Sequence, residues 1–237
     1  MPSPAPSSWL DYWNEDTPYV SERHRILHAR RLARDVSVYI PSPDAHLLDW
    51  GCGEALGAEQ IAARCGRLTL SDGAPALLER VRRRVAGHPT IVVLAPDEVG
   101  PEVADASLDL TIVMGVVQYL PRDGLMDLLD LVHRKSRAQG RLLIGDVVPP
   151  DLSGLKDAAA LLHFGLQGGF LRAAAVGLVR AAVSRDHALV REEAGFATYE
   201  EGEMLALLES AGFEPARAPD NLGHNPHRMT FVASRTE

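Results

Sequence analysis

The sequence predicts an α/β fold built on a doubly wound, mostly parallel sheet of seven strands. Short apolar segments alternate with amphipathic segments through most of the chain, which is typical of strands buried between two layers of helices. A glycine-rich turn follows the first apolar segment, where such folds bind ligands. The last two apolar segments have no helix between them, which predicts an antiparallel C-terminal hairpin.

Composition limits what the protein does. The chain has 237 residues, of which 46% are hydrophobic, so it can form one well-packed domain. Its formal net charge of −8 argues against a nucleic-acid partner. It contains no uninterrupted apolar run of about 18 residues, and its two cysteines form no CxxC pair. We therefore expect a soluble, cytoplasmic protein without a stable membrane span, a disulfide framework or a structural zinc site.

The N-terminal 41 residues are expected to form a tail and a helical lid. Residues 1–8 are rich in proline and serine, which is typical of disorder. The segment 20–40 has helical periodicity, with Ser21 as its capping residue and Pro41 at its end. Aromatic residues near its start either close over a ligand or dock on the core, and they are Trp9, Tyr12, Trp13 and Tyr19.

Residues 42–237 are expected to form the main domain. Its predicted strands are short runs of apolar residues, and they span 46–51, 67–72, 90–94, 108–117, 140–148, 213–219 and 228–234. Its predicted helices have apolar residues at spacings of three and four, and they span 54–65, 74–86, 122–138 and about 199–211. Gly212 ends the last of these helices.

A helical insertion is predicted at about 151–195, after the fifth strand. It is apolar, and it carries four glycines between 165 and 177 together with three spaced arginines. The preferred interpretation is a lid that covers a hydrophobic ligand. The alternatives are a helix that contacts a membrane only at its surface, and an ordinary buried helix pair or homodimer contact.

The segment LLDWGCGEALGAE, residues 47–59, connects the first strand to the next helix. Its pattern is D49-W-G51-C-G53-E-A55-L-G57. Glycine loses more conformational freedom on folding than any other residue, so this density of glycines indicates a tight turn or a closely approaching ligand. The spacing does not match the dinucleotide fingerprint GxGxxG, which counts against a nicotinamide cofactor.

This pattern resembles motif I of the class I S-adenosylmethionine-dependent methyltransferases, an acid followed by alternating glycines, with Ala55 in place of the third glycine. The resemblance covers residues 42–150 and 196–237. It implies a Rossmann-like fold and S-adenosyl-L-methionine as the cofactor. The cofactor-binding residues that it implies are Asp49, Gly51, Gly53, Asp72, Gly73, Asp97 and Met114, with Glu98 as the alternative to Asp97.

The chemistry of this cofactor agrees with the residue types. A ribose diol suits a carboxylate that accepts two hydrogen bonds, which favours Asp72 at the end of the second strand. The alternative is that Asp72 caps the helix that begins near Ala74. A close-packed backbone at Gly51 and Gly53 can meet the amino-acid tail. Asp49 is expected to orient the loop and to favour the positive charge of the ligand, and the alternative is that it only braces the loop.

Methyl transfer from a sulfonium depends on the alignment of donor and acceptor more than on a dedicated catalytic group. Gln118 and Tyr119 follow the fourth strand at the carboxyl edge of the sheet. Tyr119 is expected either to line the methyl channel or to pack under the turn at Pro121. His224 is the candidate base or substrate contact. The expected substrate-binding residues are Gln118, His163, Asn225 and Arg228.

Two pairs of histidines lie close together in the sequence. His24 and His28 lie one helical turn apart among arginines, and we expect them on a solvated helix face. His224 and His227 lie close together in the C-terminal loop, but no third ligand is evident, so no metal site is predicted.

The predicted function is S-adenosyl-L-methionine-dependent transfer of a methyl group to a small, apolar or lipid-like acceptor. One alternative is a non-catalytic scaffold or subunit that binds the cofactor, since no residue is an obvious catalyst. A weaker alternative is a nicotinamide-dependent oxidoreductase, which the glycine spacing and the antiparallel tail disfavour. The sequence does not decide whether oxygen, nitrogen, carbon or sulfur accepts the methyl group.

Overall fold

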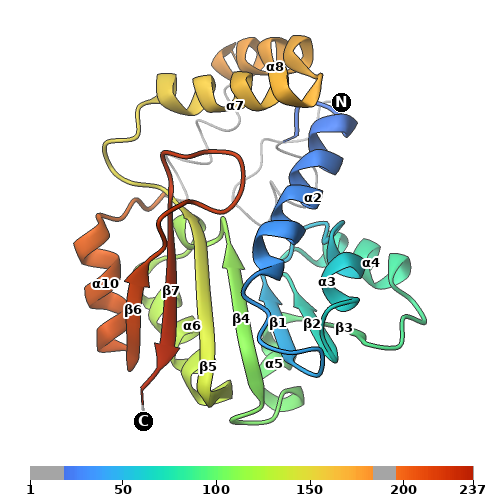
Figure 1. Cartoon of the computed structure of the whole chain (residues 1–237), viewed down its shortest axis with the longest axis vertical. Coiled ribbons are helices and arrows are strands. Elements are labelled where there is room, and N and C mark those ends of the chain that lie inside the picture. The colour runs from blue at the N-terminus through green and yellow to red at the C-terminus, as the bar shows by residue number, and fades with distance from the viewer. Residues whose placement is uncertain (1–18, 184–195, 237) are drawn as a thin grey trace, which may run out of the picture.

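A computed structural model describes residues 19–183 and 196–236 of the protein. Its centre is a seven-stranded sheet in the order β3-β2-β1-β4-β5-β7-β6 (Figure 1). In this sheet β7 runs antiparallel to both of its neighbours, β5 and β6, which confirms the predicted C-terminal hairpin. The strands are β1 (His46–Trp50), β2 (Arg67–Ser71), β3 (Ile91–Leu94), β4 (Leu108–Met114), β5 (Ser136–Val147), β6 (Phe213–Arg217) and β7 (Met229–Arg235).

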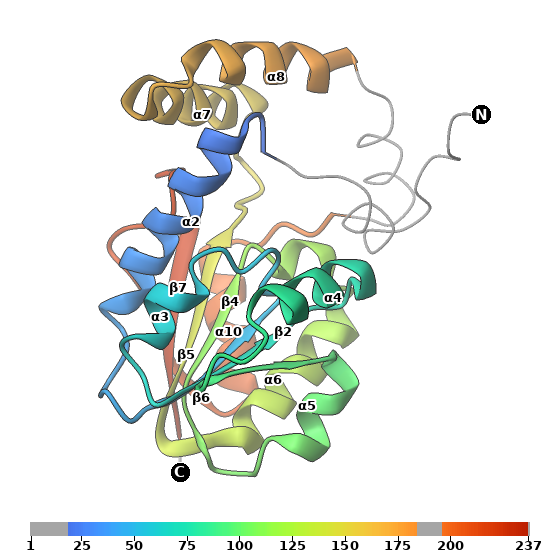
Figure 2. The ribbon, with the colours of Figure 1, turned by 90° about the vertical axis from the view of Figure 1, so that its right-hand side faces the viewer.

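Helices cover both faces of this sheet (Figure 2). Adjacent residues of β1 show the two layers, because Leu47 packs in one hydrophobic cluster with α2 and α3 and Leu48 packs in another with α5. Helices α6 and α10 cover β4, β5 and β7. The helices are α2 (Glu22–Ser37), α3 (Ala58–Ala62), α4 (Pro75–Arg84), α5 (Pro96–Glu102), α6 (Arg122–Lys135), α7 (Gly154–Gly168), α8 (Leu171–Val183) and α10 (Glu201–Ser210).

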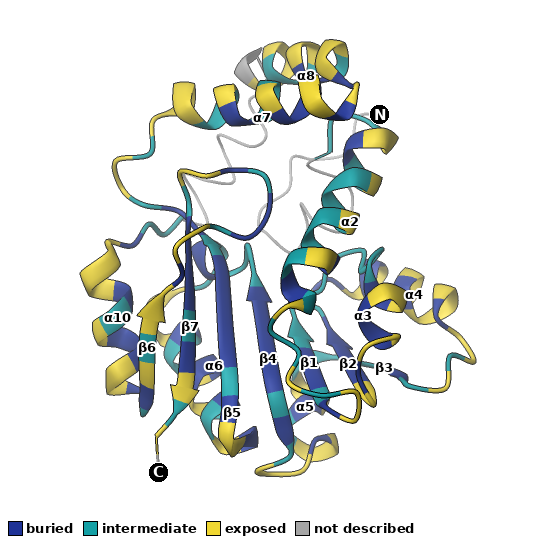
Figure 3. Ribbon diagram, in the orientation of Figure 1, coloured by how far each residue is buried: buried dark blue, intermediate teal, exposed yellow. Residues whose placement is uncertain are grey.

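The central strands are buried on both sides (Figure 3). Four leucines of β1 and β2 have no exposed surface, namely Leu47, Leu48, Leu68 and Leu70. This explains why these strands read as continuous apolar runs rather than as alternating patterns. The fold class predicted from the sequence is confirmed.

Several predicted boundaries differ from the structure, three of them instructively. The first helix ends at Ser37, before Pro41, although Ser21 caps it as expected by accepting a hydrogen bond from the His24 N–H. The helix predicted at 54–65 is only α3, because the preceding residues are used by a turn. β5 begins at Ser136 rather than at residue 140, across a shift of strand register.

The insertion forms the helix pair α7 and α8, which lies beyond the carboxyl ends of β1 and β4 (Figures 1 and 2). Phe164 and Phe170 are buried between this pair and Leu27 of α2. The outer surface of the pair is apolar and exposed at Leu155, Leu166, Leu171, Val176 and Val179 (Figure 3). No helix in the described ranges is both long enough and apolar enough to cross a membrane.

Some predictions lie outside the described residues. They concern the disordered tail of residues 1–8, the aromatic residues Trp9, Tyr12 and Trp13, and the end of the insertion at 184–195. The domain limits of 1–41 and 42–237, and a lid role for the insertion, stay predictions.

Candidate active site

The glycine loop turns sharply at the carboxyl end of β1. The N–H groups of Gly51 and Cys52 both donate to the Ser71 carbonyl, at 2.8 and 2.9 Å, which ties the loop to β2. Gly51 and Gly53 have φ angles of +75° and +54°. Ala55 has a φ of +43°, so an alanine adopts the left-handed conformation that a glycine would adopt at lower cost.

The two glycines differ in what surrounds them. A Cβ atom at Gly51 would lie 2.3 Å from Cγ2 of Val116, so this position is closed by the protein itself. A Cβ atom at Gly53 would meet no described atom within 4 Å. Gly53 therefore faces open space at the edge of the sheet, which is typical of a backbone segment that contacts a ligand.

Asp72 holds this loop in place from the end of β2. Its carboxylate accepts hydrogen bonds from the N–H groups of Gly53 and Ala74, each at 2.9 Å. The capping alternative is not confirmed, because the N-cap residue of α4 is Ala74 and no side chain caps this helix. Asp72 instead braces the turn before α4 and orients Gly53. Each oxygen still has capacity for a further hydrogen bond, so binding of a ribose diol by Asp72 stays a prediction.

Asp49 lies on β1 and is partly buried below the loop. Burial, with a smaller contribution from the nearby Asp72 carboxylate, raises the pKa of Asp49 to about 7. Among the described residues, no hydrogen-bond donor or cation contacts this carboxylate. Asp49 is therefore a carboxylate without a counter-charge, and it suits a ligand that brings a positive charge.

The remaining predicted cofactor residues lie around the same edge. Gly73 is exposed beside Asp72, and Met114 ends β4. Glu98 is engaged in the structure, since it accepts a hydrogen bond from the Ala95 N–H at 2.6 Å and caps α5. Asp97 is exposed one residue earlier, which leaves it as the better candidate for the adenine.

Gln118 and Tyr119 lie in a short 3-10 helix after β4, Val117–Tyr119. Gln118 is buried, and its Nε2 donates to the Gly115 carbonyl at 2.9 Å while its Oε1 has no described partner. Tyr119 packs edge-on against Phe196. Both residues line a pocket of about 350 Å³ whose other walls are Leu120, Pro121, Arg122, Phe196, Ala197, Thr198, Tyr199 and Glu203.

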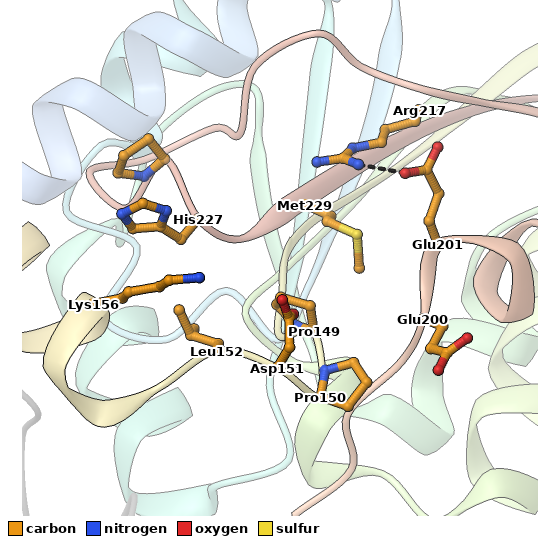
Figure 4. A pocket seen from close by; sticks show the side chains of 11 residues that line it. Pro149, Pro150, Asp151, Leu152, Lys156, Glu200, Glu201, Arg217, His227 and Met229 are labelled. Atoms are coloured by element: carbon orange, nitrogen blue, oxygen red, sulfur yellow. Dashed lines mark hydrogen bonds and ion pairs between the residues drawn. The ribbon is translucent and has the colours of Figure 1, made fainter.

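A larger pocket, of about 500 Å³, lies between β7, α7 and α10 (Figure 4). Lys156 and His227 lie at one end, the ion pair between Arg217 and Glu201 lies at the other, and Met229 is between them (Figure 4). None of the residues that the sequence suggested for catalysis or cofactor binding lines this pocket.

Asn225 and Arg228 join a polar network under the β6–β7 loop. Arg228 forms ion pairs with Asp146 at 2.5 Å and with Asp157 at 3.1 Å. Asn225 is buried and donates to Asp157 at 2.5 Å. The network connects the end of β5, the first turn of α7 and the β6–β7 loop, so both residues stabilise the contacts between these segments. Contact of Asn225 and Arg228 with a substrate stays a prediction.

Sequence reasoning missed the acidic partners in this network. Asp146 has a left-handed φ of +60°, and its Oδ2 lies 3.7 Å from where a Cβ of Gly115 would be, so it links the network to the end of β4. Asn221 donates to the carboxylate of Asp146 at 3.2 Å. An acidic residue at the carboxyl end of the fifth predicted strand was the available signal.

Replacing Arg228 by methionine is expected to lower the free energy of unfolding by about 2 kcal/mol, because Asp146 and Asp157 lose their shared cation in a partly buried site. Urea denaturation measures this change. The control is Arg217→Met, which removes an exposed ion pair with Glu201 and should cost less than about 1 kcal/mol. Equal effects of the two substitutions would contradict the assigned role of Arg228.

Three of the histidines considered in the sequence, His24, His28 and His163, have well-defined surroundings in the structure. His24 and His28 do not form a solvated face: His24 is buried, and both rings pack toward His224, at ring-centre distances of 5.8 and 5.5 Å. His163 is exposed and hydrogen bonds Gln167, one turn further along α7. Its neighbour Phe164 is the inward residue and stacks on His224 at 5.0 Å.

The comparisons with known proteins agree with this geometry. Residues 47–140, from β1 into β5, match the family model described as "Methyltransferase domain". Nodulation protein S of Rhizobium tropici is 30% identical over 111 residues, which are 46% of this chain and 43% of that protein. The match thus spans less than half the length of this curated relative.

Solved structures share the fold at low sequence identity. The N-methyltransferase NodS from Bradyrhizobium japonicum WM9 superposes with a TM-score of 0.52, at 18% identity, over 91% of this chain and 97% of that one. The Burkholderia thailandensis 1,6-didemethyltoxoflavin-N1-methyltransferase gives a TM-score of 0.57, at 18% identity, over 89% and 79%.

The sheet order, the acid-and-glycine loop and the family match together define the class of protein. Residues 47–140 form a methyltransferase domain, and the resemblance of the chain to the class I S-adenosylmethionine-dependent methyltransferases is confirmed. S-adenosylmethionine is the cofactor of this class. The residues present fit it, because the carboxylate of Asp49 lacks a described counter-charge and the backbone at Gly53 faces open space.

Proposed function

We propose that this protein transfers the methyl group of S-adenosylmethionine to a small, apolar acceptor. The observation that carries the proposal is the pairing of the unneutralised Asp49 with the open glycine at position 53, one strand away from the aromatic pocket at Tyr119. The cofactor binds at the loop, and the acceptor binds beyond the end of β4.

The side chains then have separate tasks. Asp49 neutralises the positive charge of the cofactor, and Asp72 fixes the Gly53 N–H while accepting from the ribose hydroxyls. Gly73, Met114 and Asp97 complete the cofactor site. When bound, the cofactor supplies a methyl group on a sulfonium that is already activated as a leaving group.

The pocket of about 350 Å³ has the size and lining of a small-molecule site. Tyr119, Phe196 and Tyr199 supply aromatic surface, and Gln118 is a further lining residue whose Oε1 is buried without a described partner. We assign Gln118 to orient the acceptor and Tyr119 to line the methyl channel. Such alignment contributes roughly 7–11 kcal/mol in favourable cases, which makes a universal base unnecessary.

Other predicted acceptor contacts have weaker support. Burial lowers the pKa of His224 to about 4, with His28 as a second cause, so the ring is neutral at pH 7 but is a weaker base than an ordinary histidine. It packs with His24, His28 and Phe164 rather than with Tyr119. The exposed apolar residues of α7 and α8 support a lipid-like acceptor or a contact at a membrane surface.

A panel of small apolar molecules, incubated with S-adenosylmethionine and the full chain, tests this proposal. Mass spectrometry should detect S-adenosylhomocysteine together with a product heavier by one methylene unit. The variant Asp72→Ala should lose at least about tenfold in turnover at low cofactor concentration, and Asp130→Ala, an exposed residue of α6, should not. Cofactor binding without methylation of any acceptor would favour the scaffold alternative.

A further inference from the structure

Three histidines converge beyond the carboxyl edge of the sheet. His24 and His28 come from consecutive turns of α2, and His224 comes from the β6–β7 loop, 196 positions further along the chain than His28. One ring nitrogen from each residue can be chosen so that all three lie within 4.8 Å of one another. None of the described cofactor residues belongs to this cluster.

The rings are held in an apolar, aromatic enclosure. Phe170 stacks on His24 and Phe164 stacks on His224, each at 5.0 Å between ring centres. Within this enclosure, Nε2 of His24 and Nδ1 of His28 are buried and have no described hydrogen-bond partner. A buried polar group left unpaired costs about 1–3 kcal/mol, so ordinary packing does not explain two of them side by side.

The local charges also admit a cation. Arg228, the guanidinium of the polar network, is paired with both Asp146 and Asp157. Arg31 of α2 is paired with Asp35. The network beside the histidines therefore contains two carboxylates, Asp146 and Asp157, and one guanidinium, Arg228, which gives it a net negative charge.

We propose that His24, His28 and His224 bind one divalent transition-metal ion, with zinc as the preferred ion. Imidazole nitrogen is a good ligand for zinc, copper and nickel. Sites with three protein ligands keep a fourth position for water or an exogenous ligand, whereas closed structural sites use four. The described residues supply three ligands, so the fourth position takes water or an oxygen or nitrogen atom of a small molecule.

Metal binding requires small adjustments. Zinc–nitrogen bonds of about 2.0–2.1 Å place tetrahedral ligand atoms about 3.4 Å apart, so the rings must move closer together than they are here. Binding through Nε2 of His24 also gives up the hydrogen bond from the Val20 N–H to Nδ1, which is long at 3.3 Å and therefore weak. The bound ion would fasten α2 to the β6–β7 loop.

The test uses the full, tag-free chain after removal of metal by a chelator. Calorimetric titration with zinc chloride should show one ion per chain at submicromolar affinity, and cobalt(II) should give the visible absorption of a four-coordinate, nitrogen-bound ion. His28→Ala and His224→Ala should weaken zinc binding at least roughly tenfold. His227→Ala and His163→Ala, which change exposed histidines outside the cluster, should leave zinc binding unchanged.

Absence of stoichiometric zinc binding by the unmutated protein would overturn the proposal, and so would equal zinc affinity in all four variants. Zinc should also raise the melting temperature of the unmutated protein and not that of His224→Ala. These readouts do not require methyl transfer, so their outcome is independent of the proposed activity.

Discussion

Replacing Asp49 by asparagine is expected to stabilise the free protein and to weaken S-adenosylmethionine binding at least tenfold, or by about 1.4 kcal/mol. The reason is that the carboxylate is partly buried without a described counter-charge, while the cofactor brings one. The two effects have opposite signs, which is typical of a residue kept for binding at the expense of stability.

The stability effect has a defined pH dependence. The pKa of Asp49 is raised from near 4 to about 7, mainly by burial, so between these pH values the folded protein keeps a proton that the unfolded chain has released, and stability falls as pH rises from about 4 to about 7. The gain from Asp49→Asn should therefore be small near pH 4, grow as pH rises from about 4 to about 7, and level off above pH 7 at about 2–4 kcal/mol. Urea denaturation at several pH values measures it.

The control is Asp130→Asn, which changes an exposed carboxylate of α6. It should alter neither the pH profile of stability nor the affinity for S-adenosylmethionine. A destabilised Asp49→Asn protein with unchanged cofactor affinity would show that Asp49 only braces the loop.

Replacing Gly53 by alanine is expected to weaken cofactor binding at least about tenfold with a stability loss of only about 1 kcal/mol. The added methyl group meets no described atom, so the folded protein accommodates it apart from the strain of a positive φ. It would instead occupy the space proposed for the cofactor. Calorimetric titration and urea denaturation separate the two effects.

Two further glycines make this experiment specific. Gly87 also has a positive φ, of +80°, and open space at its Cβ position, so Gly87→Ala should give a similar stability loss with normal cofactor binding. Gly51→Ala should instead destabilise the protein by about 2–4 kcal/mol, because its methyl group collides with Val116. If Gly53→Ala bound the cofactor as well as Gly87→Ala does, the loop would not be the cofactor site.

The sheet could be predicted from the sequence because its signals are local. Each central strand is buried on both faces, so a short apolar run between turn residues identifies it. The glycine loop was recognised in the same way, from the spacing of Asp49, Gly51 and Gly53. The start of α3 was misplaced because the residues up to Gly57, including Ala55 with its positive φ, belong to the turn.

The histidine cluster could not be predicted, because its members are brought together only by the tertiary fold. On α2, the arginines around His24 and His28 suggested a solvated face, yet the inward side of that helix is set by Phe164 and Phe170 of the insertion. Likewise, Asn225 and Arg228 looked like a free polar group until Asp146 and Asp157 were placed beside them. Neither partnership leaves a periodic signal in the sequence.

Calorimetric titration of the unmutated protein with S-adenosylmethionine, and separately with S-adenosylhomocysteine, tests the central claim most directly. Both compounds should bind one-to-one with micromolar affinity. S-adenosylmethionine should also bind more tightly as pH rises toward about 7, where Asp49 of the free protein ionises, and its affinity should then level off. Absence of binding by either compound to a protein that circular dichroism shows to be folded would contradict the assignment of the glycine loop.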